Sequence, residues 1–207
     1  MSGLSARLLL WSSFCVCPFA QAQDRMPPLA AEDLTEAQAT SVAELERVRG
    51  YGPRGPWIPL LRSPELMIRA RAMGDYLRFN SSLPPRLSEF VILMAAREWA
   101  QEYEWHAHRD IAIDAGLRPE IVQAIAEGRH PDGMAEDEAV LYEFCRELNG
   151  NKSVSDETYA GMIAQFGERG LIDAVGIMGY YTLLAMVMNT ARTPVPEGAE
   201  PELSSIP

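Results

Sequence analysis

The stretch EYEWHAH, residues 102–108, holds two of the chain's three histidines and two carboxylates within seven residues. Imidazole and carboxylate groups commonly transfer protons in enzymes, so this segment is a candidate for general acid–base chemistry. On a helix, residues four apart share a face, which pairs Glu104 with His108 and Glu102 with His106. The two histidines are two residues apart and point in nearly opposite directions, so they cannot serve one site on an unbroken helix.

The neighbours of each histidine predict different surroundings. His108 shares its side of the helix with Ile111, which directs it toward a core, whereas His106 lies on a side with Arg109 and Asp110, a combination typical of a solvated surface. We therefore expect His108 to be functional and His106 to face water.

A further carboxylate, Glu89, belongs to the preceding apolar segment LPPRLSEFVILMAAREWA. Its helical face continues through Leu93 and Ala96, and a charged carboxylate in apolar surroundings is costly unless it is paired or hydrogen-bonded. Spacing alone leaves two interpretations open. Glu89 is either a proton donor in a site or the partner of Arg86 or Arg97 in a structural ion pair.

The elements that must position these side chains are all expected to be helices. From Asp33 onward apolar residues recur with helical spacing, and no useful length alternates with the period of a strand. Thr35 to Gln38 matches a capping box, and Ser63-Pro64-Glu65 matches a helix start. We predict an all-α, single-domain helical bundle over residues 33–193, followed by a flexible acidic tail at 194–207.

The most apolar segment of this domain lies near its end. No charged residue occurs from Ala174 to Met188, but these fifteen residues include glycine and tyrosine and fall short of the roughly 20 that span a membrane. We expect a helix of the core or of a subunit interface.

The N-terminus matches a secretory signal peptide. Arg7 precedes an apolar run from Leu8 to Ala20, and Ala20-Gln21-Ala22 fits an A-x-A cleavage site, so residues 1–22 are expected to be removed. The alternative is an uncleaved interfacial anchor. Cleavage would leave an exported protein, periplasmic or secreted, with no membrane segment.

Charge and cysteine content restrict the function further. The 207 residues carry a formal charge of −11 without a run of Lys or Arg, which argues against nucleic-acid binding. Two of the three cysteines, Cys15 and Cys17, fall in the signal peptide. Cys145 would remain alone, without an intramolecular disulfide, and its apolar helical surroundings indicate packing.

The segment LSEFVILMAAREWAQEYEWHAHRDIAIDAGL resembles the carboxymuconolactone decarboxylase family, a branch of the all-helical alkyl hydroperoxidase D-like superfamily. The resemblance is in register at Glu89, at the Tyr-Glu-Trp-x-x-His of residues 103–108 and at Ala-Gly-Leu of 115–117. It extends over residues 55–67 and 179–198. The resemblance implies a homo-oligomer.

The peroxidase branch of this superfamily carries Cys-x-x-Cys-x-x-x-His with a glutamate upstream. By resemblance, that glutamate falls on Glu89, the histidine on His108, and the two cysteines on Gln101 and Glu104. Neither of the last two can form a thiolate, so cysteine peroxidase chemistry is excluded. The resemblance then implies the decarboxylase-like branch, whose type reaction removes carbon dioxide from a carboxylated unsaturated lactone without a cofactor.

We therefore hypothesise a lyase, or a related acid–base enzyme, acting on a small carboxylated, lactone-like substrate. His108 would act as acid and base, with Glu89 as its proton partner. The residues expected to bind substrate are Tyr103, Glu104, Trp105, Trp57 and Arg54. Because an exported protein would not meet a cytoplasmic aromatic-degradation intermediate, the substrate itself stays open.

Two alternatives remain. A non-catalytic helical oligomer could keep the fold and bind a small molecule without turnover. A metal site of Glu89, Glu104 and His108 is disfavoured, because the Glu-x-x-x-His spacing differs from the Glu-x-x-His of di-iron bundles and only one well-placed histidine is available. No cofactor and no metal are expected.

Overall fold

The computed structural model describes residues 23–203, so the predicted signal peptide at 1–22 and the last four residues of the predicted tail lie outside it. Within that part of the chain the secondary structure is helical and contains no strand, which confirms the predicted all-α class. A 3-10 turn, η1 (Ala31–Asp33), comes before the α-helices. These are α1 (Glu36–Arg49), α2 (Trp57–Leu60), α3 (Pro64–Phe79), α4 (Pro85–Glu98), α5 (Glu102–Asp114), α6 (Pro119–Ala126), α7 (Glu136–Asn151) and α8 (Asp156–Ala191).

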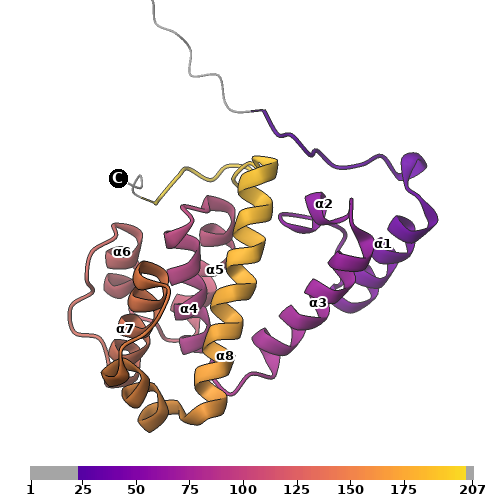
Figure 1. Cartoon of the computed structure of the whole chain (residues 1–207). Helices are drawn as coiled ribbons and strands as arrows, with labels where there is room; N and C mark the ends of the chain where they lie inside the picture. Colours follow the sequence, from indigo (N-terminus) through magenta and orange to yellow (C-terminus); the bar gives the residue numbers. More distant parts are fainter. Residues whose placement is uncertain (1–22, 204–207) are drawn as a thin grey trace, which may run out of the picture.

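Helix α4 is the centre of the core. It begins at the Pro84-Pro85 pair, which predisposes the chain to a helix start, and it packs against α5, α7 and α8. Four consecutive side chains of α4, residues 90–93, are each at most 1% exposed, as expected for a helix that is apolar nearly all round. In Figure 1, α4 to α7 lie on one side of the long helix α8, and α1 to α3 lie on the other.

Helix α8 consists of two helical segments that meet at Gly167. Gly167 divides them with φ 66° and ψ 178°, a backbone conformation that is essentially restricted to glycine. The second segment provides most of the buried side chains of this element, and these include Tyr180 and Tyr181.

By length and composition, α8 is the one helix in residues 23–203 that is long and apolar enough to cross a membrane. Half of its 18-residue apolar window is buried inside the protein, and core helices of soluble proteins pass the same test. This observation is therefore weak evidence for a membrane span.

Candidate functional site

Glu89 and His108 meet at the contact between α4 and α5. A turn at residues 99–101 reverses the chain, with Ala100 at a positive φ of 44° and the Gln101 side chain accepting a hydrogen bond from the Glu104 main-chain amide. This turn brings the Glu89 Oε2 atom to 2.6 Å from the His108 Nδ1 atom. Both side chains are buried, with 6% and 7% of each residue exposed.

The geometry of this pair sets the roles of its atoms. A carboxylate can only accept, so the Nδ1–H of His108 donates to Glu89 and the Nε2 atom is left for a ligand. The His108 ring is held from another side by Tyr181, whose ring meets it edge-on at 5.0 Å between centroids. The imidazole is therefore fixed in one orientation by two independent contacts.

Neither arginine considered as a structural partner pairs with Glu89. Arg86 forms ion pairs with Asp137, at 2.6 Å, and with Glu138 of α7. The guanidinium nearest to Glu89 belongs to Arg78 of α3, whose Nη2 atom lies 3.8 Å from Oε1. This distance is too long for a hydrogen bond.

His108 lines a cavity of about 920 Å³ between α3, α5, α8 and the segment that enters α2. The volume lies in the range of sites for small molecules. Aromatic rings supply much of the wall, and guanidinium groups supply most of its charge. The aromatic residues are Tyr51, Trp57, Phe79, Tyr103, Tyr180 and Tyr181, and the charged ones are Arg49, Arg54, Asp75 and Arg78.

Three of the residues expected to bind substrate lie on this wall: Arg54, Trp57 and Tyr103. Gly55, at φ 54°, lies directly against Tyr103, and a Cβ atom at position 55 would come within 2.3 Å of that ring. A glycine at position 55 therefore lets the loop close over Tyr103. Burial raises the pKa of Tyr103, so its hydroxyl stays protonated and can donate.

The other two expected residues do not line the cavity. Trp105 is fully buried in the core, where its Nε1 atom donates to Glu202 at 3.1 Å, so it does not line this cavity and its expected contact with substrate stays a prediction. Glu104 is 3% exposed, and neither of its carboxyl oxygens has a hydrogen-bond partner among residues 23–203. Burial raises the pKa of Glu104 well above its usual value, which favours a neutral carboxylic acid.

No protein-family model matches this chain, and no curated protein matches it. Solved structures do. The chain is similar to an uncharacterized peroxidase-related protein from Ralstonia eutropha JMP134 described as an alkylhydroperoxidase AhpD core, with TM-score 0.67 and 16% identity over 84% of this chain and 92% of that one. The chain has the alkyl hydroperoxidase D-like fold.

A second similar structure with the alkyl hydroperoxidase D-like fold is the debrominase Bmp8. A cysteine-to-alanine variant of Bmp8 in complex with 2,3,4-tribromopyrrole matches with TM-score 0.66 and 15% identity over 86% of this chain and 94% of that one. The apo form matches with TM-score 0.64 and 15% identity, over 83% and 92% of the two chains. These likenesses confirm the fold that the resemblance implies.

The chain holds one cysteine among residues 23–203. Cys145 of α7 is fully buried, and burial raises the pKa of its thiol, so it is poorly suited to thiolate chemistry. Its apolar packing agrees with the sequence-based expectation. Among the same residues no group of three or more metal-ligating side chains is close enough to hold an ion.

The expectation that His106 faces water is wrong. Residues 200–203 of the C-terminal segment fold back over α5, and the His106 Nε2 atom lies 2.8 Å from the Glu200 carbonyl oxygen, leaving its side chain 10% exposed. Glu102 accepts hydrogen bonds from the main-chain amides of Glu202 and Leu203. The C-terminal segment therefore covers Glu102 and His106 on the polar side of α5, whereas Asp110 stays exposed.

Sequence analysis missed the contributions of α3 and α8 to the cavity. Arg78 and the tyrosines at positions 180 and 181 come from helices that are distant in sequence from His108. Burial raises the pKa of both tyrosines, so their hydroxyls remain protonated. The two adjacent tyrosines in an otherwise apolar segment could have indicated a site. Nothing in the sequence around Arg78 indicated one.

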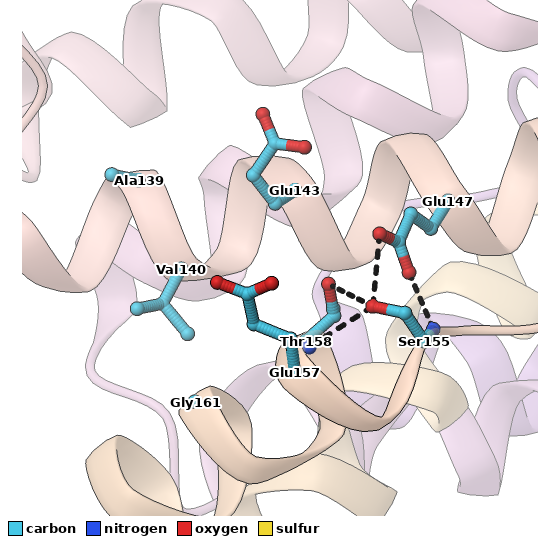
Figure 2. Close-up of a pocket in the computed structure, with 8 residues that line it drawn as sticks. All are labelled: Ala139, Val140, Glu143, Glu147, Ser155, Glu157, Thr158 and Gly161. Atoms are coloured by element: carbon cyan, nitrogen blue, oxygen red, sulfur yellow. Dashed lines mark hydrogen bonds between the residues drawn. The ribbon is translucent and has the colours of Figure 1, made fainter.

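A second hollow, of about 500 Å³, lies between α7 and α8, and its lining is shown in Figure 2. Its carboxylates include Glu147, whose oxygens accept hydrogen bonds from the Ser155 amide at 2.6 Å and the Ser155 hydroxyl at 3.2 Å. Ser155 in turn caps the start of α8. These contacts are local helix-end interactions, and they do not indicate a site.

Proposed function

We propose that this protein is a cofactor-free acid–base enzyme acting on a small carboxylated, lactone-like ring compound, with decarboxylation as its type reaction. The observation that carries the proposal is the buried Glu89–His108 hydrogen bond of 2.6 Å at the wall of a cavity that holds guanidinium and aromatic groups. Paired titratable side chains in a pocket of this kind are typical of general acid–base sites.

The reaction assigned to this site has two steps. First, the bond between the ring and its carboxylate breaks, carbon dioxide leaves, and the electron pair passes into the conjugated lactone. Second, the resulting carbanion takes a proton from the Nε2 atom of protonated His108, and solvent later restores that proton. Glu89 stabilises the imidazolium before the transfer. Positioned proton transfer of this kind contributes about 10²- to 10⁴-fold to a rate.

The site supports acid–base chemistry better than thiol chemistry. One similar protein is described as peroxidase-related and another is a debrominase, and these activities are those of the similar proteins. In this chain the positions that the resemblance assigns to thiols hold Gln101 and Glu104. Gln101 caps α5 and donates to Asn189 at 2.9 Å, a structural role.

The test is an assay of carbon dioxide release from a panel of carboxylated lactones. Glu89→Gln and His108→Ala are each expected to lower the rate by about 10²- to 10⁴-fold. His130→Ala is the matched control, because His130 is exposed and its ring packs on Tyr142, away from the cavity. Unchanged activity in both site variants would refute the assignment, and tight ligand binding without turnover would favour a non-catalytic binding protein.

We further propose that the mature protein begins after Ala22 and is exported. The support is the order of charge, apolar run and A-x-A site in residues 1–22. Mass spectrometry of the protein recovered from an expressing bacterium should show the loss of these residues. Full-length protein in the cytoplasmic fraction would contradict this proposal.

A further inference from the structure

The charge of the cavity is opposite to that of the chain. The chain carries a formal charge of −11, yet the cavity wall has three arginines and one aspartate. A concave surface of one charge sign raises the local concentration of ligands of the opposite sign. The cavity is therefore electrostatically suited to an anion.

One of the three arginines is already neutralised by protein. The Arg49 Nη2 atom lies 2.5 Å from the Asp75 carboxylate, which also pairs with Arg71 at 2.6 Å. Arg71 reaches Glu44 of α1 at 2.5 Å. These contacts form a network that ties α1 to α3, so Arg49 has a structural partner and is not available to a ligand.

Arg78, by contrast, has no hydrogen-bonded carboxylate in the described chain. Its Nη2 atom forms an ion pair with Glu89 Oε1 at 3.8 Å, beyond hydrogen-bond distance, and Glu89 directs its other oxygen to His108. The Arg78 Nε atom is buried without any hydrogen-bond partner. A buried donor without a partner is unfavourable, and a guanidinium presents donors in a fork that matches a carboxylate.

The position of Arg78 places its guanidinium group beside the acid–base pair. Arg78 and His108 both line the cavity, and each lies next to the Glu89 carboxylate, at 3.8 Å and 2.6 Å respectively. Tyr181, which holds the His108 ring edge-on, belongs to the same wall. A planar ring that contacts these aromatic groups would carry its anionic substituent toward Arg78.

We propose that Arg78 forms an anion-binding subsite that selects ring compounds bearing a carboxylate over their neutral counterparts. The inference rests on the proposed function, because it names the residue that orients the substrate of the same site. Arg78 is a binding and positioning residue and transfers no proton. Arg54 is a less suitable candidate, because its guanidinium stacks on the Tyr51 ring at 3.8 Å.

The experiment is a calorimetric titration of purified protein with benzoate and with benzamide at low ionic strength, where charge interactions are least screened. It compares the unmodified protein with Arg78→Gln, Arg78→Lys and Arg69→Gln. Arg69 is the matched control, because it lies on the same helix with a 75% exposed side chain that pairs only with Glu65. Circular dichroism establishes that each variant is folded.

Benzoate is expected to bind about tenfold or more tightly than benzamide, and Arg78→Gln is expected to weaken benzoate binding by a similar factor. Arg78→Lys, which keeps the charge but not the fork, should give an intermediate affinity, and Arg69→Gln should change nothing. The proposal would be overturned if folded Arg78→Gln bound benzoate as tightly as the unmodified protein does. It would also be overturned if the unmodified protein bound benzoate and benzamide equally well, or did not bind benzoate.

The titration is independent of turnover. Arg78-dependent benzoate binding in a protein that releases no carbon dioxide from lactones would leave the subsite standing and refute the lyase assignment. Carbon dioxide release that depends on Glu89 and His108, together with unchanged benzoate affinity in Arg78→Gln, would refute the subsite alone.

Discussion

The Glu104 carboxyl group lies one helical turn before His108, and in the described part of the chain neither oxygen has a hydrogen-bond partner. It is surrounded by core side chains, and burial raises its pKa well above the usual value. A buried polar group without a partner is a departure from normal packing and often has a functional reason. By the resemblance, residue 104 corresponds to a thiol position of the peroxidase branch, and the raised pKa favours a neutral acid there.

Glu104→Gln is expected to stabilise the protein at neutral pH. A carboxyl group whose pKa is raised on folding does not penalise folding below its unfolded pKa, and the penalty grows as pH rises toward the folded pKa. Glutamine is neutral at every pH, so the gain should be small at pH 4 and larger at pH 7. A gain of about 1 kcal/mol in the free energy of unfolding would raise the unfolding temperature by roughly 2–4 °C in a domain of this size.

The measurement is thermal unfolding of both proteins as a function of pH. A neighbouring first-turn acid, Glu102, provides the control, because it is partly exposed and hydrogen-bonded to the main-chain amides of Glu202 and Leu203. Glu102→Gln should destabilise the protein at neutral pH, because it replaces the carboxylate that accepts these two hydrogen bonds. If Glu104→Gln also lowers the unfolding temperature at pH 7, its carboxylate has a favourable partner in solution.

At the scale of elements, the C-terminal segment acts as an additional layer on α5. Glu202 accepts hydrogen bonds from Arg109 and from the Trp105 ring, and Pro196 of the same segment lines the cavity. Burial alone would raise the pKa of Glu202, but these hydrogen bonds outweigh burial and lower it. The segment therefore connects the covered face of α5 with one edge of the cavity.

Glu202→Gln is expected to destabilise the protein by about 1 kcal/mol at pH 7, because it removes a charge-assisted contact between partly exposed groups. Since the pKa of Glu202 is lowered on folding, its contribution is present above the unfolded pKa and is lost as pH falls through the folded pKa. The difference between the two proteins should therefore disappear in acid.

The measurement is again thermal unfolding, combined with tryptophan fluorescence to report on Trp105. Glu200→Gln is the control, because residue 200 contacts His106 through its main-chain carbonyl, which glutamine keeps. A loss of the same size in Glu200→Gln would show that the carboxylate contacts of Glu202 do not determine how the segment binds.

The bend in α8 depends on one residue. Gly167→Ala is expected to cost about 1–3 kcal/mol of unfolding free energy, because the backbone at position 167 has a conformation that alanine rarely adopts. An added Cβ would meet no atom within 4 Å, so the cost is conformational and not steric.

Chemical denaturation measures this cost, and Gly179→Ala on the same element is the control. Gly179 is exposed and helical, and a Cβ there also meets nothing, so alanine should be neutral or stabilising by up to about 1 kcal/mol. Equal effects of the two substitutions would mean that the α8 bend is not maintained in solution.

At the scale of the whole molecule, the exposed apolar side chains lie largely on α3 and α8. They include Ile172 and Phe79, each 64% exposed, and Met73 at 46%. The homo-oligomer implied by the resemblance stays a prediction, and these helices hold apolar surface that an association would bury.

Light scattering should give a particle mass that is a multiple of the chain mass. Ile172→Glu is expected to lower this particle mass. Burying a charge without a partner opposes association. Tyr159→Glu is the control, because Tyr159 is 49% exposed but lies before the Gly167 bend. A monomer at all concentrations would contradict the predicted oligomer.

The amino-acid sequence by itself determined the helical class, and it led to the prediction that Glu89 and His108 act together. Helical periodicity is a local property, and the inward direction of His108 follows from the spacing of its neighbours on one helix. The resemblance in register at Glu89 then related two residues nineteen positions apart, which the structure places in contact.

Only the tertiary structure showed that side chains of α3 and α8 line the cavity together with His108. Arg78 and Tyr181 come from α3 and α8, and no local pattern predicts that helices so far apart in sequence converge on one wall. The same reason explains the wrong expectation for His106, because the residues that cover it are nearly a hundred positions away. Helical spacing predicts which side of a helix is polar, but the packing of the rest of the chain determines whether that side meets water.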